Sequence, residues 1–513
     1  MSTQSDSAAE EELPDEEDAI LEEPAPASRQ GMTRRLIGGT LNYGIGQALP
    51  QFLRFIQVLV FTQVLTEADY GILELASKFS GFLTQFMRLG VPGAVTRFYY
   101  DHREGRALTD YVTTIAIFLV GSSLAIGGIV LAVGPWLFAR YLPDMAFYPY
   151  GLLALGTAVL SCNQNLQDRL VQAREQSRYM AVLNVVRAVL FIALAMLLVL
   201  VWRKGAYGML LAEVIATAIV FLQAGRYLLP NLRGRFDRSM LRSSIHYGLG
   251  ILPNHFVWNL TNLSTSAILA DMAGLAEVGK FGVATKFTLP LIVLAQAFQT
   301  AYLPIYFSLR SDHSEKNVAT LVRTGRFVWA AALWVSIGGI FFIPPFIRLA
   351  TPVEFHNSAA LVPIMVVGFL GQTVFFLFGP ELYYSKKTYL VPITSVVSAI
   401  VTLTVTLLTV KSSGAAGVAW ANSLGYLASA LTAVVLTRRL VSIPYCLADL
   451  VRLSVCALVV FAAGWMLTGE TIVQGAAVTV ATAAAFPVLL WITGDPTVRE
   501  AAQFVRRRLA MLR

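Results

Sequence analysis

Apolar residues dominate the chain from Arg34 onward, in runs separated by short polar or charged connections. A transmembrane helix needs about 20 mainly apolar residues, and fourteen runs of suitable length can be counted. Several contain an internal proline, which membrane helices tolerate because neighbouring groups satisfy the freed backbone. The pattern predicts an all-α polytopic membrane protein with fourteen transmembrane helices, centred near residues 50, 83, 124, 160, 190, 217, 256, 291, 333, 370, 399, 426, 457 and 483.

Basic residues are concentrated in alternate connections between these runs. Eighteen lie in the connections of one side, beginning with the connection after the second run, and six lie on the other side. Because Lys and Arg accumulate in cytoplasmic loops, the richer side is predicted to be cytoplasmic. Both chain termini fall on that side, so we expect a multi-pass protein of the cell inner (plasma) membrane with both termini in the cytoplasm.

One stretch of sequence occurs twice, about 208 residues apart. The segment Asp69-Tyr-Gly71, with Lys78 and Phe79 further on, returns as Glu277-Val-Gly279 with Lys286 and Phe287. A second pair of segments, Gly205-Ala-Tyr-Gly208 and Gly414-Ala-Ala-Gly417, is separated by almost the same interval. Six runs, an even number, separate the copies, so both copies have the same orientation in the membrane. Such parallel repeats are related by an axis along the membrane normal, an arrangement found in transporters.

The repeat divides the chain. We predict two six-helix lobes, residues 34–235 and 236–440, followed by two additional transmembrane helices within residues 441–495. Residues 1–31 contain ten acidic residues and a single base and are rich in Pro, Ala and Ser, which predicts a disordered acidic cytoplasmic tail. Residues 496–513 form a basic cytoplasmic tail. The acidic segment has no basic start followed by an apolar core, so it does not resemble a signal peptide.

Polar side chains recur inside the apolar runs at spacings of three or four residues, which place them on one helix face. A charged side chain facing lipid is costly, so such residues are expected to face protein or a wet cavity. The 208-residue offset pairs three polar positions of the first run with three of the seventh: Gln47, Gln51 and Arg54 with His255, Asn259 and Asn262. The second run carries Glu74, Lys78 and Arg88, the eighth Lys286, and three further runs carry Asp168, Arg187 and Glu381.

Two lobes facing each other would line a central cavity with these side chains, and basic groups outnumber acidic ones among them. A cationic, water-filled cavity suits an anionic headgroup, because Arg can hold phosphate oxygens bidentately. Some positions also fit structural roles. Arg88 and Asp168 are near run ends, from which a side chain reaches the interface. Arg187 fits a bond to an adjacent helix, and His255 fits an interhelical hydrogen bond better than a proton site. The most central cations are Arg54, Lys78 and Lys286.

Composition and motifs exclude several functional classes of protein. The chain of 513 residues is 56% hydrophobic and 14% charged, with a net charge of +8 and three cysteines, and it shows no Cys/His metal-binding spacing. Gly274 to Lys280 matches the spacing of a phosphate-binding loop, but Phe281 replaces the required Ser or Thr. We therefore expect no metal, no cofactor and no nucleic-acid partner. A membrane glycan polymerase or ligase would need a long extracytoplasmic loop, and none is predicted, so we expect no enzyme.

Three segments of the first copy carry a family resemblance: Leu65-Thr-Glu-Ala-Asp69-Tyr-Gly71, Arg88-Leu-Gly90 and Val95-Thr-Arg97-Phe98. They resemble the first helix pair of bacterial oligosaccharide flippases. Asp271, Ala276-Glu-Val-Gly279 and Ala284-Thr-Lys286-Phe287 resemble the corresponding part of the second half. These Wzx-type transporters belong to the multidrug/oligosaccharidyl-lipid/polysaccharide exporter superfamily. The resemblance covers about residues 34 to 495.

The resemblance implies a MATE-like fold of two six-helix lobes plus two helices, and alternating access. It implies a flippase that moves a polyprenyl-pyrophosphate-linked oligosaccharide to the outer leaflet for O-antigen, capsule or exopolysaccharide synthesis. Membrane lipids would be partners, and a polysaccharide polymerase and export machinery are compatible with this role. The candidate substrate-binding residues are Gln47, Gln51, Arg54, Lys78, Arg88, Arg187, His255, Asn259, Asn262 and Lys286.

Coupling of transport to proton or sodium exchange is compatible with the resemblance. The candidate ion carriers are Glu74, Asp168 and Glu381. Two related activities stay open: a cation-coupled multidrug exporter, which would favour a more acidic cavity, and a lipid II-type flippase, whose relatives have a more arginine-rich cavity. In those flippases the last two helices offer a groove for the lipid tail, and the tail would pass between the first and eighth spans.

Overall fold

The computed structural model describes residues 55–99, 105–174, 176–311, 314–385, 387–440, 447–467 and 472–494. All regular elements in these residues are helices, and no strand occurs among them. The all-α prediction is confirmed. Nine of the described helices are long and apolar enough to cross a membrane, so the chain is a multi-pass membrane protein. The number fourteen stays a prediction, because most of the first run lies outside the described residues.

The first repeat copy, predicted over residues 34–235, is described from residue 55, and residues 55–61 are helical. Its long helices are α2 (Glu67–Arg88), α4 (Gly105–Tyr141), α5 (Leu152–Ala173), α6 (Ser177–Ala195) and α7 (Gly205–Leu228). Shorter pieces are α3 (Val91–Phe98), η1 (Phe147–Gly151), η2 (Met196–Val201) and η3 (Leu229–Asn231). A capping box starts α2: the Thr66 hydroxyl accepts from the backbone N–H of Asp69, whose carboxylate accepts from the backbone N–H of Thr66.

The second repeat copy contains α8 (Arg238–Ala273), α9 (Leu275–Ser311), α10 (Glu315–Ala350), α11 (Val362–Phe378) and α13 (Val391–Leu440). Shorter pieces are η4 (Val353–Leu361), α12 (Pro380–Tyr384) and η5 (Thr388–Leu390). The 50-residue α13 contains two of the predicted runs, which meet at Gly414, where φ is 50° and ψ is −128°. The added helices are α14 (Leu447–Leu467) and α15 (Ile472–Ile492).

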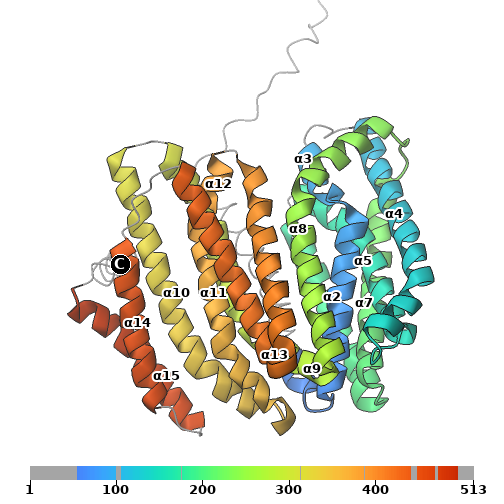
Figure 1. Cartoon of the computed structure of the whole chain (residues 1–513). Helices are drawn as coiled ribbons and strands as arrows, with labels where there is room; N and C mark the ends of the chain where they lie inside the picture. Colours follow the sequence, from blue (N-terminus) through green and yellow to red (C-terminus); the bar gives the residue numbers. More distant parts are fainter. Residues whose placement is uncertain are drawn as a thin grey trace, which may run out of the picture.

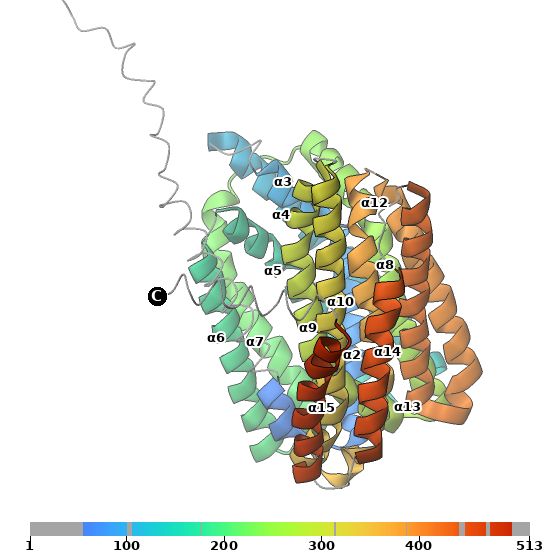
Figure 2. The same ribbon diagram turned by 90° about the vertical axis from the view of Figure 1, so that its left-hand side faces the viewer.

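The helices form a two-sided bundle. Figure 1 shows α4, α5 and α7 on one side and α10, α14 and α15 on the other, with α8 and α13 between them. The view in Figure 2 shows α14 and α15 next to α10, and both pack against it. Between the copies, α2 packs against α9 and α8, while α8 also packs against α13. The largest buried cluster spans both copies and includes Phe61, Leu75, Val283, Val366 and Val418.

Three helices of the interior are absent from the nine apolar ones. They are α2, α5 and α8, which are 22, 22 and 36 residues long and carry the polar stripes that lower their hydropathy. Helices that carry polar residues inside a membrane protein face the bundle interior or a wet cavity. Two of them, α2 and α8, pack against each other where the two copies meet, while α5 packs against α2 and α7 within the first copy.

Candidate substrate-binding site

An acidic side chain near the start of α2 fixes the turn into α7. Asp69 Oδ1 accepts a hydrogen bond of 3.1 Å from the Ala206 backbone N–H, and Oδ2 accepts from the Thr66 hydroxyl at 2.9 Å. Gly205 in this turn has a φ of 53°, a backbone conformation that favours glycine. A Cβ atom at Gly205 would lie only 3.1 Å from Asp69 Oδ1. The acidic residue of the repeated motif therefore anchors a helix start within its own copy.

Glu277 makes the same contact in the second copy. Its Oε2 accepts 2.8 Å from the Ala415 backbone N–H, directly after Gly414, whose φ is also positive. Its Oε1 accepts 2.9 Å from Lys280 Nζ. Lys280 Nζ also lies 3.7 Å from Glu67 Oε2 of α2, so this group links the two copies. The repeat found in the sequence thus corresponds to one turn-anchoring contact made twice.

Two repeat-equivalent glycines allow α2 and α9 to cross closely. A Cβ atom at Gly71 would lie 2.0 Å from the Leu275 carbonyl oxygen, and one at Gly279 would lie 1.9 Å from the Glu67 carbonyl oxygen. Both distances are far below van der Waals contact, and both partners are backbone atoms. Only glycine fits at this α2–α9 crossing. The crossing holds the two copies together at the end of the bundle where α2 and α9 begin.

Lys78 lies about two helical turns beyond Gly71 along α2. Its Nζ donates 2.6 Å to Ser266 Oγ of α8, and forms an ion pair of 3.2 Å with Glu74 Oε1. The ammonium group also lies 5.0 Å from the centroid of the Phe281 ring of α9. Only 17% of the Lys78 side chain and 12% of the Glu74 side chain are exposed. A first-copy lysine is therefore held by two second-copy helices.

Lys286 occupies the equivalent position on α9. Its Nζ lies 4.8 Å from the centroid of the Tyr70 ring of α2, a cation–π contact that also crosses between the copies. The Glu74 carboxylate pairs with Lys78 at 3.2 Å and also attracts the charge of Lys286. Gly282 leaves room for it, because a Cβ atom there would lie 3.1 Å from Glu74 Oε2. We call Glu74, Lys78 and Lys286 the two-lysine cluster.

The other predicted substrate-binding residues are distributed more widely. Gln47, Gln51 and Arg54 lie outside the described residues. On α8, the Asn259 amide donates 2.8 Å to the His255 carbonyl oxygen, and the Asn262 amide donates 2.9 Å to that of Trp258. These amide nitrogens therefore bond within their own helix, and the exposed ring of His255 lies on the same helix.

Arg88, Asp168 and Arg187 lie in the first copy, on α2, α5 and α6 respectively. Arg88 Nη2 donates 2.6 Å to the Ser161 carbonyl oxygen, and both arginines are near enough to attract the Asp168 carboxylate. Arg88 is ten residues from Lys78 along α2, about 15 Å at 1.5 Å per residue. The structure therefore separates this group from the two-lysine cluster.

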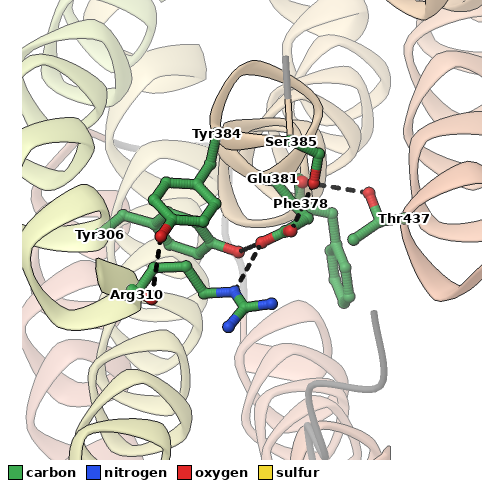
Figure 3. Close-up of polar contacts among 7 residues, drawn as sticks. All are labelled: Tyr306, Arg310, Phe378, Glu381, Tyr384, Ser385 and Thr437. Atoms are coloured by element: carbon green, nitrogen blue, oxygen red, sulfur yellow. Dashed lines mark hydrogen bonds and ion pairs between the residues drawn. The ribbon is translucent and has the colours of Figure 1, made fainter. Parts of the chain in front are cut away.

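Glu381 is fully buried on α12 and its carboxylate accepts three hydrogen bonds (Figure 3). Oε2 accepts 2.5 Å from Tyr306 Oη and 3.2 Å from Arg310 Nε, and Oε1 accepts 2.7 Å from Ser385 Oγ. Tyr384 Oη in turn donates 3.2 Å to the Arg310 carbonyl oxygen. This network joins the last turns of α9 to α12, about 20 residues or 30 Å beyond Lys286 along α9. Glu381 therefore ties two helices of one copy together.

The sequence pattern indicates Lys78, Lys286 and Glu74 as site residues but not Tyr70, Phe281 or Gly282, which surround them. The 208-residue offset pairs Gly282 with Glu74, so a signal for this contact was present in the sequence. The two aromatic residues carried no such signal, because an aromatic residue on an apolar helix usually belongs to the core. Among the described residues, no group of three or more His, Cys, Asp or Glu side chains is arranged to hold a metal ion.

The fold and this site define a membrane transporter built from two facing repeat copies. The sequence profile described as "Polysaccharide biosynthesis protein" matches residues 36–310, which is more than half of the chain. The chain therefore belongs to this family of the multidrug/oligosaccharidyl-lipid/polysaccharide exporter superfamily, as the Wzx-type resemblance indicated. Its family and structural relatives are transporters and flippases, not catalytic enzymes. A comparison with curated proteins finds no match.

Solved structures of two kinds of transporter share the fold. A lipid II flippase MurJ in an inward closed conformation has a TM-score of 0.72 at 12% identity, covering 88% of this chain and 99% of that one. An inward-facing multidrug resistance MATE family transporter has a TM-score of 0.62 at 14% identity, covering 77% and 97%. A MATE transporter of Vibrio cholerae has a TM-score of 0.51 at 15% identity, covering 81% and 98%. At these identities the similarity establishes a MurJ/MATE-like fold.

Proposed function

We propose that this transporter is a flippase for a polyprenyl-pyrophosphate-linked oligosaccharide, which it moves from the cytoplasmic to the outer leaflet. Alternating access would arise from movement of the lobes 34–235 and 236–440 against each other. The observation that carries the proposal is the two-lysine cluster. Lys78 and Lys286 come from equivalent positions in the two copies, and each contacts the opposite copy.

A cationic pair at the boundary between lobes suits an anionic headgroup. A lipid-linked pyrophosphate carries several negative oxygens, and charge-assisted hydrogen bonds to such oxygens are stronger than neutral ones. An arriving headgroup would replace the contacts of Lys78 with Ser266 and of Lys286 with Tyr70 by charge-assisted hydrogen bonds to its own oxygens. Arg54 of the first run would be a further donor. A cationic drug would be repelled by the same groups.

The described contacts correspond to a carrier closed at one end. At the α2–α9 crossing the copies touch through backbone atoms and through the pair Lys280–Glu67. The distribution of basic loops predicts that this end lies at the outer face of the membrane, with both termini in the cytoplasm. Headgroup loading would therefore occur from the cytoplasmic side, where the oligosaccharide is assembled on its lipid.

The polyprenyl tail needs an apolar path beside the bundle, and α14 helps to build one. A cavity of about 500 Å³ lies between α10, α11, α13 and α14. Its polar atoms are largely satisfied within the protein, since Trp329 Nε1 donates 3.1 Å to Ser454 Oγ and Ser454 Oγ donates 2.8 Å to the Leu450 carbonyl oxygen. Arg438 stands at the basic-loop end of this cavity. We assign the cavity to the polyprenyl tail of the substrate during loading, lined by Trp329, Leu377, Phe378, Leu450, Val455 and Leu458.

The remaining candidate residues would have supporting roles in transport. His255, Asn259 and Asn262, with Gln47 and Gln51 of the first run, would contact the sugar. Arg88 and Arg187 would attract the headgroup toward the cavity from the cytoplasmic half. Proton or sodium exchange would involve Glu74 or Asp168. Glu381 is the least suited of the three candidate carriers, because three donors already occupy its carboxylate. A polymerase and export machinery would use the translocated product.

The test is a flipping assay with the purified chain in proteoliposomes. The substrate is a fluorescent polyprenyl-pyrophosphate oligosaccharide, and an impermeant quencher reports its leaflet. Lys78→Gln and Lys286→Gln should each slow flipping by roughly tenfold to a hundredfold, since a hydrogen bond to a charged group contributes about 1.5–3 kcal/mol. The matched control Lys411→Gln removes an exposed lysine and should flip normally. Equal rates in all four proteins, or export of cationic drugs without flipping, would contradict the proposal.

A further inference from the structure

The two-lysine cluster is asymmetric at one position of the repeat. Residue 74 of the first copy corresponds to residue 282 of the second, and the two positions face each other across the contact between α2 and α9. The first is Glu and the second is Gly. A Cβ atom at Gly282 would already be 3.1 Å from Glu74 Oε2 and 3.3 Å from Glu74 Cβ. The α2–α9 contact therefore has space for a single carboxylate at this position of the repeat, paired with Lys78 and attracting Lys286.

The members of the cluster belong to different lobes. Glu74 and Lys78 are four residues apart on α2, so they stay neighbours whatever the lobes do. Lys286 belongs to α9 of the other copy. Closing the lobes brings this second ammonium group toward the first in a poorly hydrated place, where like charges repel more strongly than in water. A carboxylate between them offsets that repulsion.

We infer that Glu74 is an internal counter-anion. In the empty carrier its carboxylate occupies the place between Lys78 and Lys286, and in the loaded carrier the substrate's pyrophosphate occupies that place. This inference rests on the proposed function. It explains how the lobes close without substrate, which a carrier must do to return for the next cycle. It also makes Glu74 a competitor of the headgroup, because both anions bind the same two ammonium groups.

Glu74→Gln should have opposite effects on headgroup affinity and on closure of the empty lobes. Glu74→Gln removes the competing charge, so the pyrophosphate group should bind roughly tenfold more tightly. The same change leaves two ammonium groups without the carboxylate between them, so the empty lobes should close less often. A salt bridge that only held the fold together would give neither the gain in affinity nor a closing defect that the ligand reverses.

The experiment uses the full chain in nanodiscs and farnesyl pyrophosphate as the probe. Affinity is measured by calorimetry for the wild type, Glu74→Gln and the control Asp271→Asn, which removes an exposed carboxylate of α8. Glu74→Asp keeps the charge on a shorter side chain and should fall between wild type and Glu74→Gln. Spin labels at Asp144 and Val353, which are exposed near the α2–α9 crossing end of the two copies, report closure by double electron–electron resonance.

The expected result is tighter probe binding and a smaller closed population for empty Glu74→Gln, with closure restored by the probe. Unchanged or weaker probe binding by a folded Glu74→Gln protein would overturn the inference. If Lys78→Gln and Lys286→Gln still abolish binding in that case, the proposed function stands and only the role of Glu74 fails. If the wild type does not bind the probe and the lysine variants flip substrate normally, the proposed function fails and the inference fails with it.

Discussion

The α2–α9 crossing gives a quantitative prediction for Gly279→Ala. The added methyl group would lie 1.9 Å from the Glu67 carbonyl oxygen and 3.1 Å from the Gly71 backbone nitrogen. The helices must separate by more than about 1 Å to relieve the first contact, and overpacking of this kind costs about 1–3 kcal/mol. That cost falls on the closed arrangement alone, because the two helices belong to different copies. The closed-to-open ratio should therefore fall by roughly 5- to 150-fold.

The assay is double electron–electron resonance between spin labels at Asp144 and Val353, with the native cysteines replaced. Gly279→Ala should move population from the short to the long distance. Gly121→Ala is the matched control, since a Cβ atom at this α4 glycine meets nothing within 4 Å. An unchanged distance distribution in Gly279→Ala would refute the view that this crossing is the contact by which the lobes close. Equal changes in both variants would refute it as well.

Two further predictions concern anchoring contacts within the second copy. Arg310→Met leaves the buried Glu381 carboxylate without its ion pair, so the free energy of unfolding should fall by about 3–5 kcal/mol. Thermal unfolding in detergent measures this, and adding Glu381→Gln should restore most of the loss; no recovery would contradict the ion-pair explanation. Gly414→Ala forces a side chain onto a φ of 50° and to 2.5 Å from Glu277 Oε2, which should lower Tm by an amount equivalent to about 1–3 kcal/mol. Gly225→Ala, with open space at its Cβ position, should unfold like the wild type.

Much of the architecture follows from local patterns in the sequence. In lipid, an apolar run of bilayer length is stable as a helix, because each of its backbone polar groups then forms a hydrogen bond within the same segment. The 208-residue offset related Asp69 to Glu277 and Lys78 to Lys286 before any contact was known. It did so because a duplicated helix pair preserves residue types at places where the backbone geometry is repeated, as at Gly205 and Gly414.

The partners of the charged residues required the tertiary structure. Sequence spacing grouped Glu74, Lys78 and Arg88 on one helix face, but only the packing shows that Lys78 reaches α8 and α9 while Arg88 bonds within the first copy. The sequence makes Glu381 a candidate ion carrier because it is an acidic residue within an apolar run. Its three donors come from positions 4 to 75 residues away, and the chain order does not reveal such partners.

The sequence alone determined the class of molecule, the repeat and the side chains that carry charge into the membrane. These properties depend on hydropathy and on periodicity along one chain. The tertiary structure decided which charges meet, because the close contact between α2 and α9 depends on two glycines 208 residues apart. That contact places Glu74 opposite Gly282, so a single carboxylate stands where the repeat could have supplied two.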